Sequence, residues 1–193
     1  MSQLRSIIDF RSALQGGGAR PNLFMVEMDA LPSGIFETET INAWTSSDNG
    51  LKKTFKFTCK AAALPASNIA SIDVPVRGKT LKIPGDRTFD PWTVTIMNTE
   101  GFEIRKIFEQ WMEYIANQNE GYAKSSNPSD YQTSATVKQL ARDADQSKSL
   151  YTKKYEFQGI YPSNISAIDM SYDSTDTISE FTVEFQVQYW VPA

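Results

Sequence analysis

The chain has 193 residues, of which 40% are hydrophobic, 12% aromatic and 22% charged, with a formal net charge of −4. This length favours a single domain with a substantial core, and the negative charge argues against a dedicated nucleic-acid binder, which usually carries a basic face. One cysteine excludes an internal disulfide framework, and the absence of histidine removes the commonest general base and most transition-metal ligand sets.

The N-terminal segment is interrupted by charges, unlike the apolar run of a signal peptide. No apolar segment of the sequence is long enough to span a bilayer, so the product is expected to stay soluble in the compartment where it is made. A short amphipathic helix is predicted first, and three glycines at 16–18 end it. Residues 1–18 are therefore an N-terminal arm, which either packs on another subunit or frays, and residues 19–193 are the single domain.

Alternation of apolar and polar residues predicts a chain made mainly of strands. In residues 54–60 it places Phe55, Phe57 and Cys59 inward, so Cys59 is interpreted as a small core residue rather than a nucleophile. The predicted strands are residues 22–31, 35–44, 54–60, 69–76, 79–83, 92–97, 134–142, 150–160, 165–172 and 178–190.

Two polar segments are predicted to be long loops. Residues 33–52, with a loop tip at 46–50, are expected to protrude as a hairpin or a loop that orders on contact. Residues 117–133 form the second, and loops of such length are usually functional or interfacial.

Residues 83–97 organise the chain as a shaped loop, a half-buried strand and the start of a helix. Gly85 and Asp86 predict a turn, and Pro91 stands where the strand begins. Asp86 and Arg87 present a carboxylate and a guanidinium that suit a bidentate pair with a neighbouring loop or chain. An exposed, weak salt bridge is the alternative.

A helix is predicted over residues 100–116, packed as a lid on the sheet. Its apolar stripe is Ile104, Ile107, Phe108, Trp111, Met112 and Ile115. Its opposite face is Glu103, Lys106, Glu109, Gln110 and Glu113.

The last predicted strand alternates most cleanly. Its core face is Phe181, Val183, Phe185, Val187 and Tyr189, and its polar face is Thr182, Glu184, Gln186 and Gln188. Residues 57–73 also echo residues 157–169, which suggests two related β-meanders separated by one helix. The predicted fold is therefore mainly β with one packed α-helix, as a β-sandwich or partly closed barrel.

The sequence contains few candidate catalytic or ligand-binding motifs. The carboxylate pairs Asp86/Asp90 and Asp143/Asp145 could serve a glycosidase, but such residues are common in turns, and no phosphate-binding loop is present. The sequence predicts no enzyme, no metal and no cofactor.

Several motifs occur in order along the chain. They are Ala19-Arg20-Pro21-Asn22-Leu23-Phe24, Phe57-Thr58-Cys59-Lys60-Ala61 with Leu64-Pro65, Gly85-Asp86-Arg87-Thr88-Phe89-Asp90-Pro91-Trp92-Thr93-Val94-Thr95-Ile96-Met97-Asn98, Leu140-Ala141-Arg142-Asp143-Ala144, Tyr161-Pro162-Ser163-Asn164 and Tyr189-Trp190. Together these motifs resemble the tail tube proteins of contractile-tailed bacteriophages. The resemblance covers residues 19–190 in order, and residues 33–52 look longer than the usual connection in that family.

The resemblance implies a structural subunit that joins sheets into a hexameric ring, with rings stacked into a hollow tube inside a contractile sheath. The implied partners are other copies of the chain, the sheath, baseplate or initiator and terminator proteins, a tape-measure protein, and viral DNA that passes without specific binding. No membrane insertion by this chain is implied. The implied location is the virion tail, assembled in the host cytoplasm. A tailocin or secretion-type tube remains an alternative, as does a β-sandwich carbohydrate- or receptor-binding module.

Site residues follow from the same resemblance. The expected lumen-facing residues are Thr182, Glu184, Gln186 and Gln188, since a neutral and acidic lining would not hold phosphates. The expected sheath-facing residues are Glu103, Lys106, Glu109 and Glu113. The expected ring-stacking or inter-subunit residues are Asp86, Arg87, Phe89, Asp90, Trp44, Asp48 and Asn49.

Overall fold

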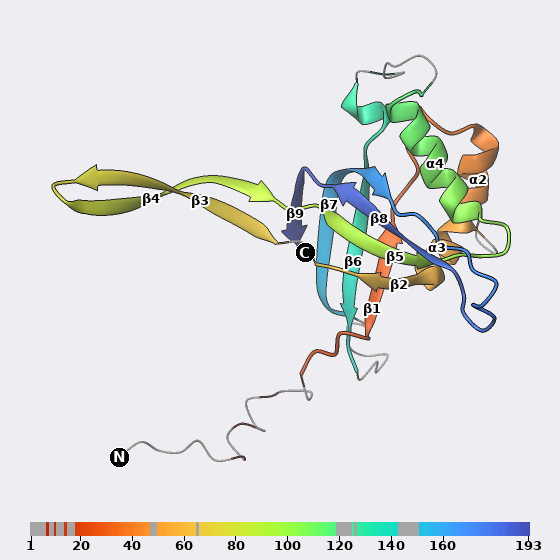
Figure 1. Cartoon of the computed structure of the whole chain (residues 1–193), viewed down its shortest axis with the longest axis horizontal. Coiled ribbons are helices and arrows are strands. Elements are labelled where there is room, and N and C mark those ends of the chain that lie inside the picture. The colour runs from red at the N-terminus through yellow and green to blue at the C-terminus, as the bar shows by residue number, and fades with distance from the viewer. Residues whose placement is uncertain are drawn as a thin grey trace.

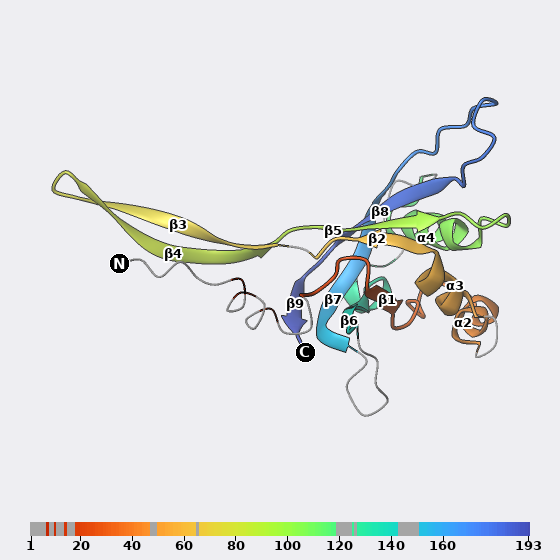
Figure 2. The same cartoon turned by 90° about the horizontal axis from the view of Figure 1, so that it is seen from below.

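The computed structural model describes residues 7, 10, 14, 18–46, 50–64, 66–118, 125, 127–142 and 151–193, and strands make up most of its regular structure. The strands are β1 (Phe24–Met28), β2 (Cys59–Ala62), β3 (Ser67–Val76), β4 (Lys79–Phe89), β5 (Trp92–Met97), β6 (Thr133–Leu140), β7 (Tyr151–Ile165), β8 (Glu180–Gln186) and β9 (Tyr189–Pro192). The helices are α2 (Thr38–Thr45), α3 (Leu51–Thr58) and α4 (Glu103–Ile115), with a 3-10 turn, η2, at Pro128–Asp130. Figure 1 and Figure 2 show a body of sheet and helices from which the hairpin β3–β4 projects as a long arm.

The body contains a seven-stranded sheet in the order β1-β6-β7-β8-β5-β2, with β9 beside β7. The long strand β7 joins two parts of this sheet. Its first part pairs with β6 and β9, and its last part pairs with β8. Gly159, between the two parts, has φ of 64°, a conformation that glycine adopts at little cost. The fold is mainly β, as predicted. The strand order ends at β1 and β2, so the described sheet is not closed into a barrel.

Aromatic rings join the sheet to the helices in one core. Trp92 of β5 stacks on Phe157 of β7 with ring centroids 4.7 Å apart. Phe108 of α4 meets Phe185 of β8 edge-on at 5.6 Å, which fixes the helix on this face of the sheet. The helix predicted over residues 100–116 is thus confirmed as α4, and its buried residues are Ile104, Ile107, Phe108 and Trp111. None of the helices in the described part of the chain is long and apolar enough to cross a membrane.

The prediction that residues 33–52 protrude is wrong. The described part of this segment contains α2 and the first residues of α3, and it folds onto the body. Trp44 at the end of α2 is fully buried, and its ring centroid lies 6.0 Å from that of Phe55 on α3. The described part of residues 19–193 therefore contains three packed helices, whereas the sequence predicted one in this domain.

The strand predicted over residues 54–60 is also wrong. Leu51 and Phe55 are four residues apart, so they lie on one face of α3, and Phe55 is buried there. Phe57, which a strand would have turned inward, is 68% exposed. Only from Cys59 onward is the chain a strand, β2.

The C-terminal part differs from prediction in two places. The strand predicted over residues 165–172 is wrong, because β7 ends at Ile165 and residues 166–179 form an irregular connection to β8. The strand predicted over residues 178–190 is two strands, β8 and β9. Phe185 and its predicted neighbours on β8 are buried, whereas Tyr189 on β9 is exposed because the break between the strands interrupts the alternation.

Two further expectations fail in the same regions. The echo between residues 57–73 and 157–169 has no structural counterpart, since the first segment begins in α3 and the second lies in and after β7. The turn predicted at Gly85-Asp86 is absent, because β4 runs through it to Phe89. The hairpin turn is instead at Arg77 and Gly78, which have φ of 44° and 83°.

Candidate assembly surfaces

The outer face of β5 and β8 is polar. The register places Thr95 opposite Thr182 and Thr93 opposite Glu184, on the side of the sheet away from the buried rings. The hydroxyls of Thr95 and Thr182 are 3.4 Å apart. Gln186 follows Glu184 on the same face, and its amide donates to Ser163 Oγ at 3.3 Å. The structure thus brings three of the four predicted lumen residues into one polar row.

Gln188 does not continue this row. It lies between β8 and β9, where its backbone N–H donates to the Gln158 carbonyl at 3.2 Å. Its side chain lies over Gly159, since a Cβ at Gly159 would stand 2.5 Å from Gln188 Cγ. Gln188 is therefore not part of the row, because the single predicted strand over residues 178–190 is broken after Gln186.

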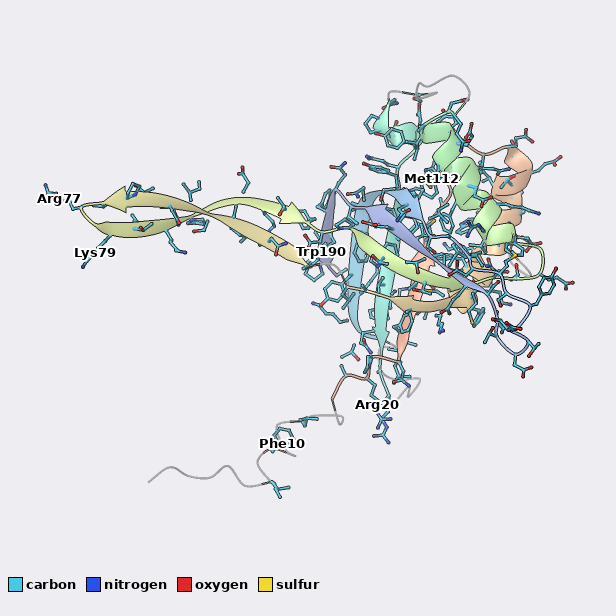
Figure 3. The ribbon with its side chains drawn as sticks, in the orientation of Figure 1. Phe10, Arg20, Arg77, Lys79, Met112 and Trp190 are labelled. Atoms are coloured by element: carbon cyan, nitrogen blue, oxygen red, sulfur yellow. The ribbon has the colours of Figure 1, made fainter. Side chains whose placement is uncertain are left out.

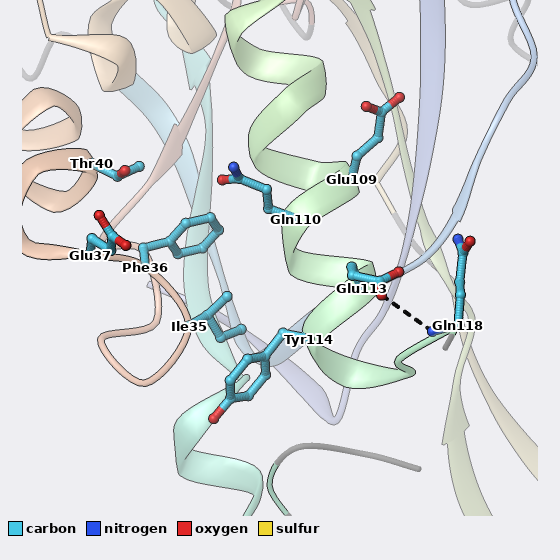
Figure 4. Close-up of a pocket in the computed structure, with 9 residues that line it drawn as sticks. All are labelled: Ile35, Phe36, Glu37, Thr40, Glu109, Gln110, Glu113, Tyr114 and Gln118. Atoms are coloured by element: carbon cyan, nitrogen blue, oxygen red, sulfur yellow. Dashed lines mark hydrogen bonds between the residues drawn. The ribbon is translucent and has the colours of Figure 1, made fainter. Parts of the chain in front are cut away.

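A groove of about 770 Å³ lies between the segment leading into α2 and the outer face of α4. Figure 4 shows Glu37, Glu109 and Glu113 among the residues that line it, together with Phe36 and Tyr114. The groove therefore combines carboxylates with aromatic rings. The structure brings together two of the predicted sheath-facing residues here, Glu109 and Glu113, whereas Glu103 and Lys106 are exposed elsewhere on α4.

Local bonds hold these carboxylates in place. Arg105 Nε donates to Glu109 Oε1 at 2.7 Å, one helical turn away. Glu113 Oε1 accepts the backbone N–H of Gln118 at 3.3 Å, the bond dashed in Figure 4. The Arg105 contact neutralises Glu109 alone, because Glu37 and Glu113 have no cation against them among the interactions of the described residues.

The expected stacking residues at the arm fall into two pairs. Phe89 and Asp90 brace the base of the arm within their own subunit: Phe89 meets Trp190 edge-on at 6.2 Å, and Asp90 Oδ1 accepts Asn68 Nδ2 at 2.9 Å. Asp86 and Arg87 are exposed on β4, and neither forms an ion pair within the described structure.

The remaining stacking candidates are Trp44, Asp48 and Asn49. The prediction that Trp44 contacts another subunit is wrong. Its side chain is fully buried in the subunit's own core, so it could reach another subunit only if α2 unfolded. Asp48 and Asn49 lie outside the described residues.

The arm also carries a surface that sequence reasoning missed. Cross-strand pairing sets Ile72 against Ile83 and Val74 against Leu81, so both pairs share one face of the hairpin. Ile72, Leu81 and Ile83 are exposed there. The period of two along both predicted strands indicates an apolar face, but it does not show that this face lies in solvent.

The structure offers little for catalysis. Burial raises the pKa of the Cys59 thiol to about 12, far from that of a nucleophilic thiolate. Within the described residues, no three acidic, cysteine or histidine side chains gather as a metal site.

Comparison with known sequences gives one consistent result. Residues 19–193 match the family model described as phage tail tube protein. The chain is 35% identical over 180 residues to the tail tube protein gp19 of Enterobacteria phage T4, covering 93% of this chain and 95% of the relative, with the same figures for gp19 of phage T6. The tail tube protein of Serratia phage KSP90 is 29% identical over 122 residues, covering 63% of this chain and 66% of the relative.

Solved structures share the fold at low sequence identity. A chain in the cryo-EM structure of the anti-feeding prophage baseplate superposes with a TM-score of 0.61 at 9% identity, covering 91% of this chain and 95% of that chain. A chain of the sheath–tube complex of PVC, an extracellular contractile injection system, in its extended state superposes with a TM-score of 0.53 at 11% identity, covering 95% and 96%.

Proposed function

The chain belongs to the phage tail tube protein family, and from this premise we propose that six copies close into a ring and that rings stack into the hollow tube of a contractile tail. As a tail tube protein it is a structural component of the virion tail. Under the proposal, a sheath surrounds the tube and viral DNA leaves through its bore without specific binding. The tube grows from a baseplate-type initiator around a tape-measure protein and ends at a terminator, and it is assembled in the host cytoplasm.

One observation carries this proposal. The sheet of the body ends at β1 and β2, and within the described structure each of these strands is paired on one side only. Unpaired strand edges template pairing with another chain, and closure of identical subunits into a ring removes such edges. A ring built on continuous sheets would therefore complete what each subunit leaves open.

The polar row on β8 supports a lumen on the outer face of this sheet. Thr182, Glu184 and Gln186 carry no positive charge, so they would neither attract nor retain the phosphates of passing DNA. The buried face of the same strand contacts α4 through Phe185 and Phe108. If one face lines the bore, α4 consequently lies on the outside of the tube.

The acidic groove then faces the sheath. Glu37 and Glu113, which have no cation against them in the described structure, would attract a basic segment, and the rings of Phe36 and Tyr114 would bury its apolar stems. We place the sheath contact at this groove, with Glu103 and Lys106 of α4 beside it.

Electron microscopy of the purified full chain tests the proposal. At high concentration, with a baseplate-type initiator present, we expect hollow rings with six-fold averages and tubes of stacked rings. A monodisperse solitary particle under these conditions would overturn it.

Asp86→Ala is expected to leave a folded subunit but to shorten or abolish the tubes. The reason is that Asp86 is exposed on the arm and lacks a partner ion in the described subunit, so another subunit would supply one. The matched control is Glu39→Ala, which removes an exposed carboxylate from α2. Tubes of normal length from Asp86→Ala would show that this residue does not contribute.

A further inference from the structure

The arm presents an apolar face to solvent. Ile72 and Leu81 are 54% and 56% exposed although they stand in cross-strand rows with Ile83 and Val74. The opposite face is polar, with Asp73 paired against Lys82. A two-stranded hairpin is marginal in water by itself, and a contiguous exposed apolar patch marks an interaction surface.

A second exposed apolar segment is the connection 166–179 between β7 and β8. Both of its ends are fixed to the body: Arg105 Nη1 donates to the Ser166 carbonyl at 3.2 Å, and the Asn98 backbone N–H donates to the Ser179 carbonyl at 2.9 Å. Between these anchors Met170 is 82% exposed and Tyr172 is fully exposed. The segment is therefore held in place while its apolar side chains stay in solvent.

The two surfaces lie at opposite ends of the molecule. Figure 1 and Figure 2, which differ by a rotation of 90°, both show the tip of the arm at one end of the longest axis and the blue connection 166–179 at the other. Surfaces at opposite ends of one chain cannot meet within a subunit, but they meet in a head-to-tail contact between copies.

We propose that the arm β3–β4 of one subunit packs its apolar face against the connection 166–179 of a second copy. This pairing rests on the proposed tube function, because a heterologous contact repeats from copy to copy and so closes a ring or extends a stack. The apolar side chains of the two surfaces, exposed in the single subunit, leave water together.

Charge selects this pairing over a contact between two arms. Figure 3 shows Arg77 and Lys79 at the tip of the arm, where both are exposed. The connection 166–179 contains no lysine or arginine, and it carries three exposed aspartates, Asp169, Asp173 and Asp176. A basic tip would be repelled by a second basic tip and attracted by the acidic connection.

Cross-linking of assembled tubes tests the contact directly. In a Cys59→Ser background, one chain carries Arg77→Cys and another carries Tyr172→Cys, and the two are mixed before assembly and treated with a short bismaleimide. We expect a cross-linked heterodimer at a yield about tenfold above the control pair Arg77→Cys with Glu39→Cys, because binding raises the effective concentration of the paired thiols. An equal yield from the control pair would overturn the proposal.

Charge reversal gives an independent readout. Asp173→Lys with Asp176→Lys, or Arg77→Glu with Lys79→Glu, should each lower the yield of sedimentable tubes about tenfold, since like charges then face one another. Both pairs of changes in one chain should restore most of that yield, as coupled sites do. Circular dichroism melts should stay unchanged because all four residues are exposed. If the combined variant instead lost as much tube yield as the two separate losses added together, the proposed contact would be contradicted.

The outcomes separate this proposal from the function on which it rests. Tubes that assemble from the cysteine variants without arm-to-connection cross-links would refute the pairing and leave the tube function standing. A wild-type chain that forms neither rings nor tubes with its initiator would refute both.

Discussion

Glu27 is held between two lysine ammonium groups at the junction of β1, β6 and α3. Lys56 Nζ lies 3.0 Å from Glu27 Oε1, and Lys138 Nζ lies 2.6 Å from Glu27 Oε2. Partial burial by itself raises the pKa of Glu27, but hydrogen bonds and charge from Lys138 and Lys56 outweigh it, so the pKa lies below its ordinary value of 4.5. This carboxylate therefore joins the helix α3 to the sheet.

Glu27→Gln should lower the free energy of unfolding by about 1 to 2 kcal/mol at pH 7, because two charge-assisted hydrogen bonds become neutral ones. A depressed pKa contributes stability that is present above the unfolded value of 4.5 and is lost as the pH falls through the folded value. The difference between wild type and variant should consequently shrink below about pH 4.5. Urea unfolding at several pH values measures it, with Glu39→Gln as the control. A difference independent of pH would contradict this account.

The thiol of Cys59 should react only when the chain unfolds. With a pKa of about 12, on the order of one thiol in ten thousand is ionised at pH 8, because burial disfavours the thiolate. Iodoacetamide labelling should be slow in buffer and fast in denaturing urea. The control is Thr177→Cys in a Cys59→Ser background, whose thiol would be exposed. Native Cys59 reacting as fast as that control would overturn the prediction.

At the scale of elements, α4 is the part of the core on which both sheet and helices depend. The ring of Phe108 contacts Phe55, Trp111 and Phe185, so it joins α3 and α4 to β8. Phe108→Ala should cost about 3 to 5 kcal/mol of unfolding free energy through lost burial and the cavity left behind. Gln110→Ala, on the exposed face of the same helix, should change it by less than about 0.5 kcal/mol. Similar urea midpoints for both variants would contradict this role.

Elements with one dominant period were predicted well from the sequence. The stripe of α4 fits only a helix, and β5 alternates without a competing pattern, so both were found close to their bounds. Residues 51–58 fit two periods at once, because Phe55 and Phe57 alternate like a strand while Leu51 and Phe55 share a helix face. Tertiary packing of Phe55 against Trp44 and Phe108 favours the helix, and such contacts between separate segments are invisible to a local pattern.

The candidate assembly surfaces were likewise predicted only where they depend on a local sequence pattern. The polar row of Thr182, Glu184 and Gln186 follows from local alternation and was predicted, whereas Gln188 was misplaced because the break after β8 leaves no local signal. The groove between α2 and α4 could not be predicted, because it needs Glu37 and Glu113 to meet across separate elements. Recognising the arm as a surface likewise required its projection from the body, which the alternation of Ile72 and Val74 does not reveal.

If the proposed tube function holds, the decisive quantity for the whole assembly is the charge that the polar row would present to passing DNA. Glu184→Lys would place a cation on that row in every subunit, and each lysine that neutralises a phosphate adds affinity that depends on salt. Virions with this change should form tails of normal length but eject DNA incompletely at low ionic strength, with ejection recovering as salt screens the attraction. The fraction of DNA released on receptor triggering measures this, and Glu39→Lys on α2 is the control with the same charge change away from the row. Complete ejection by Glu184→Lys virions, or equal retention by the control, would remove β8 from the bore.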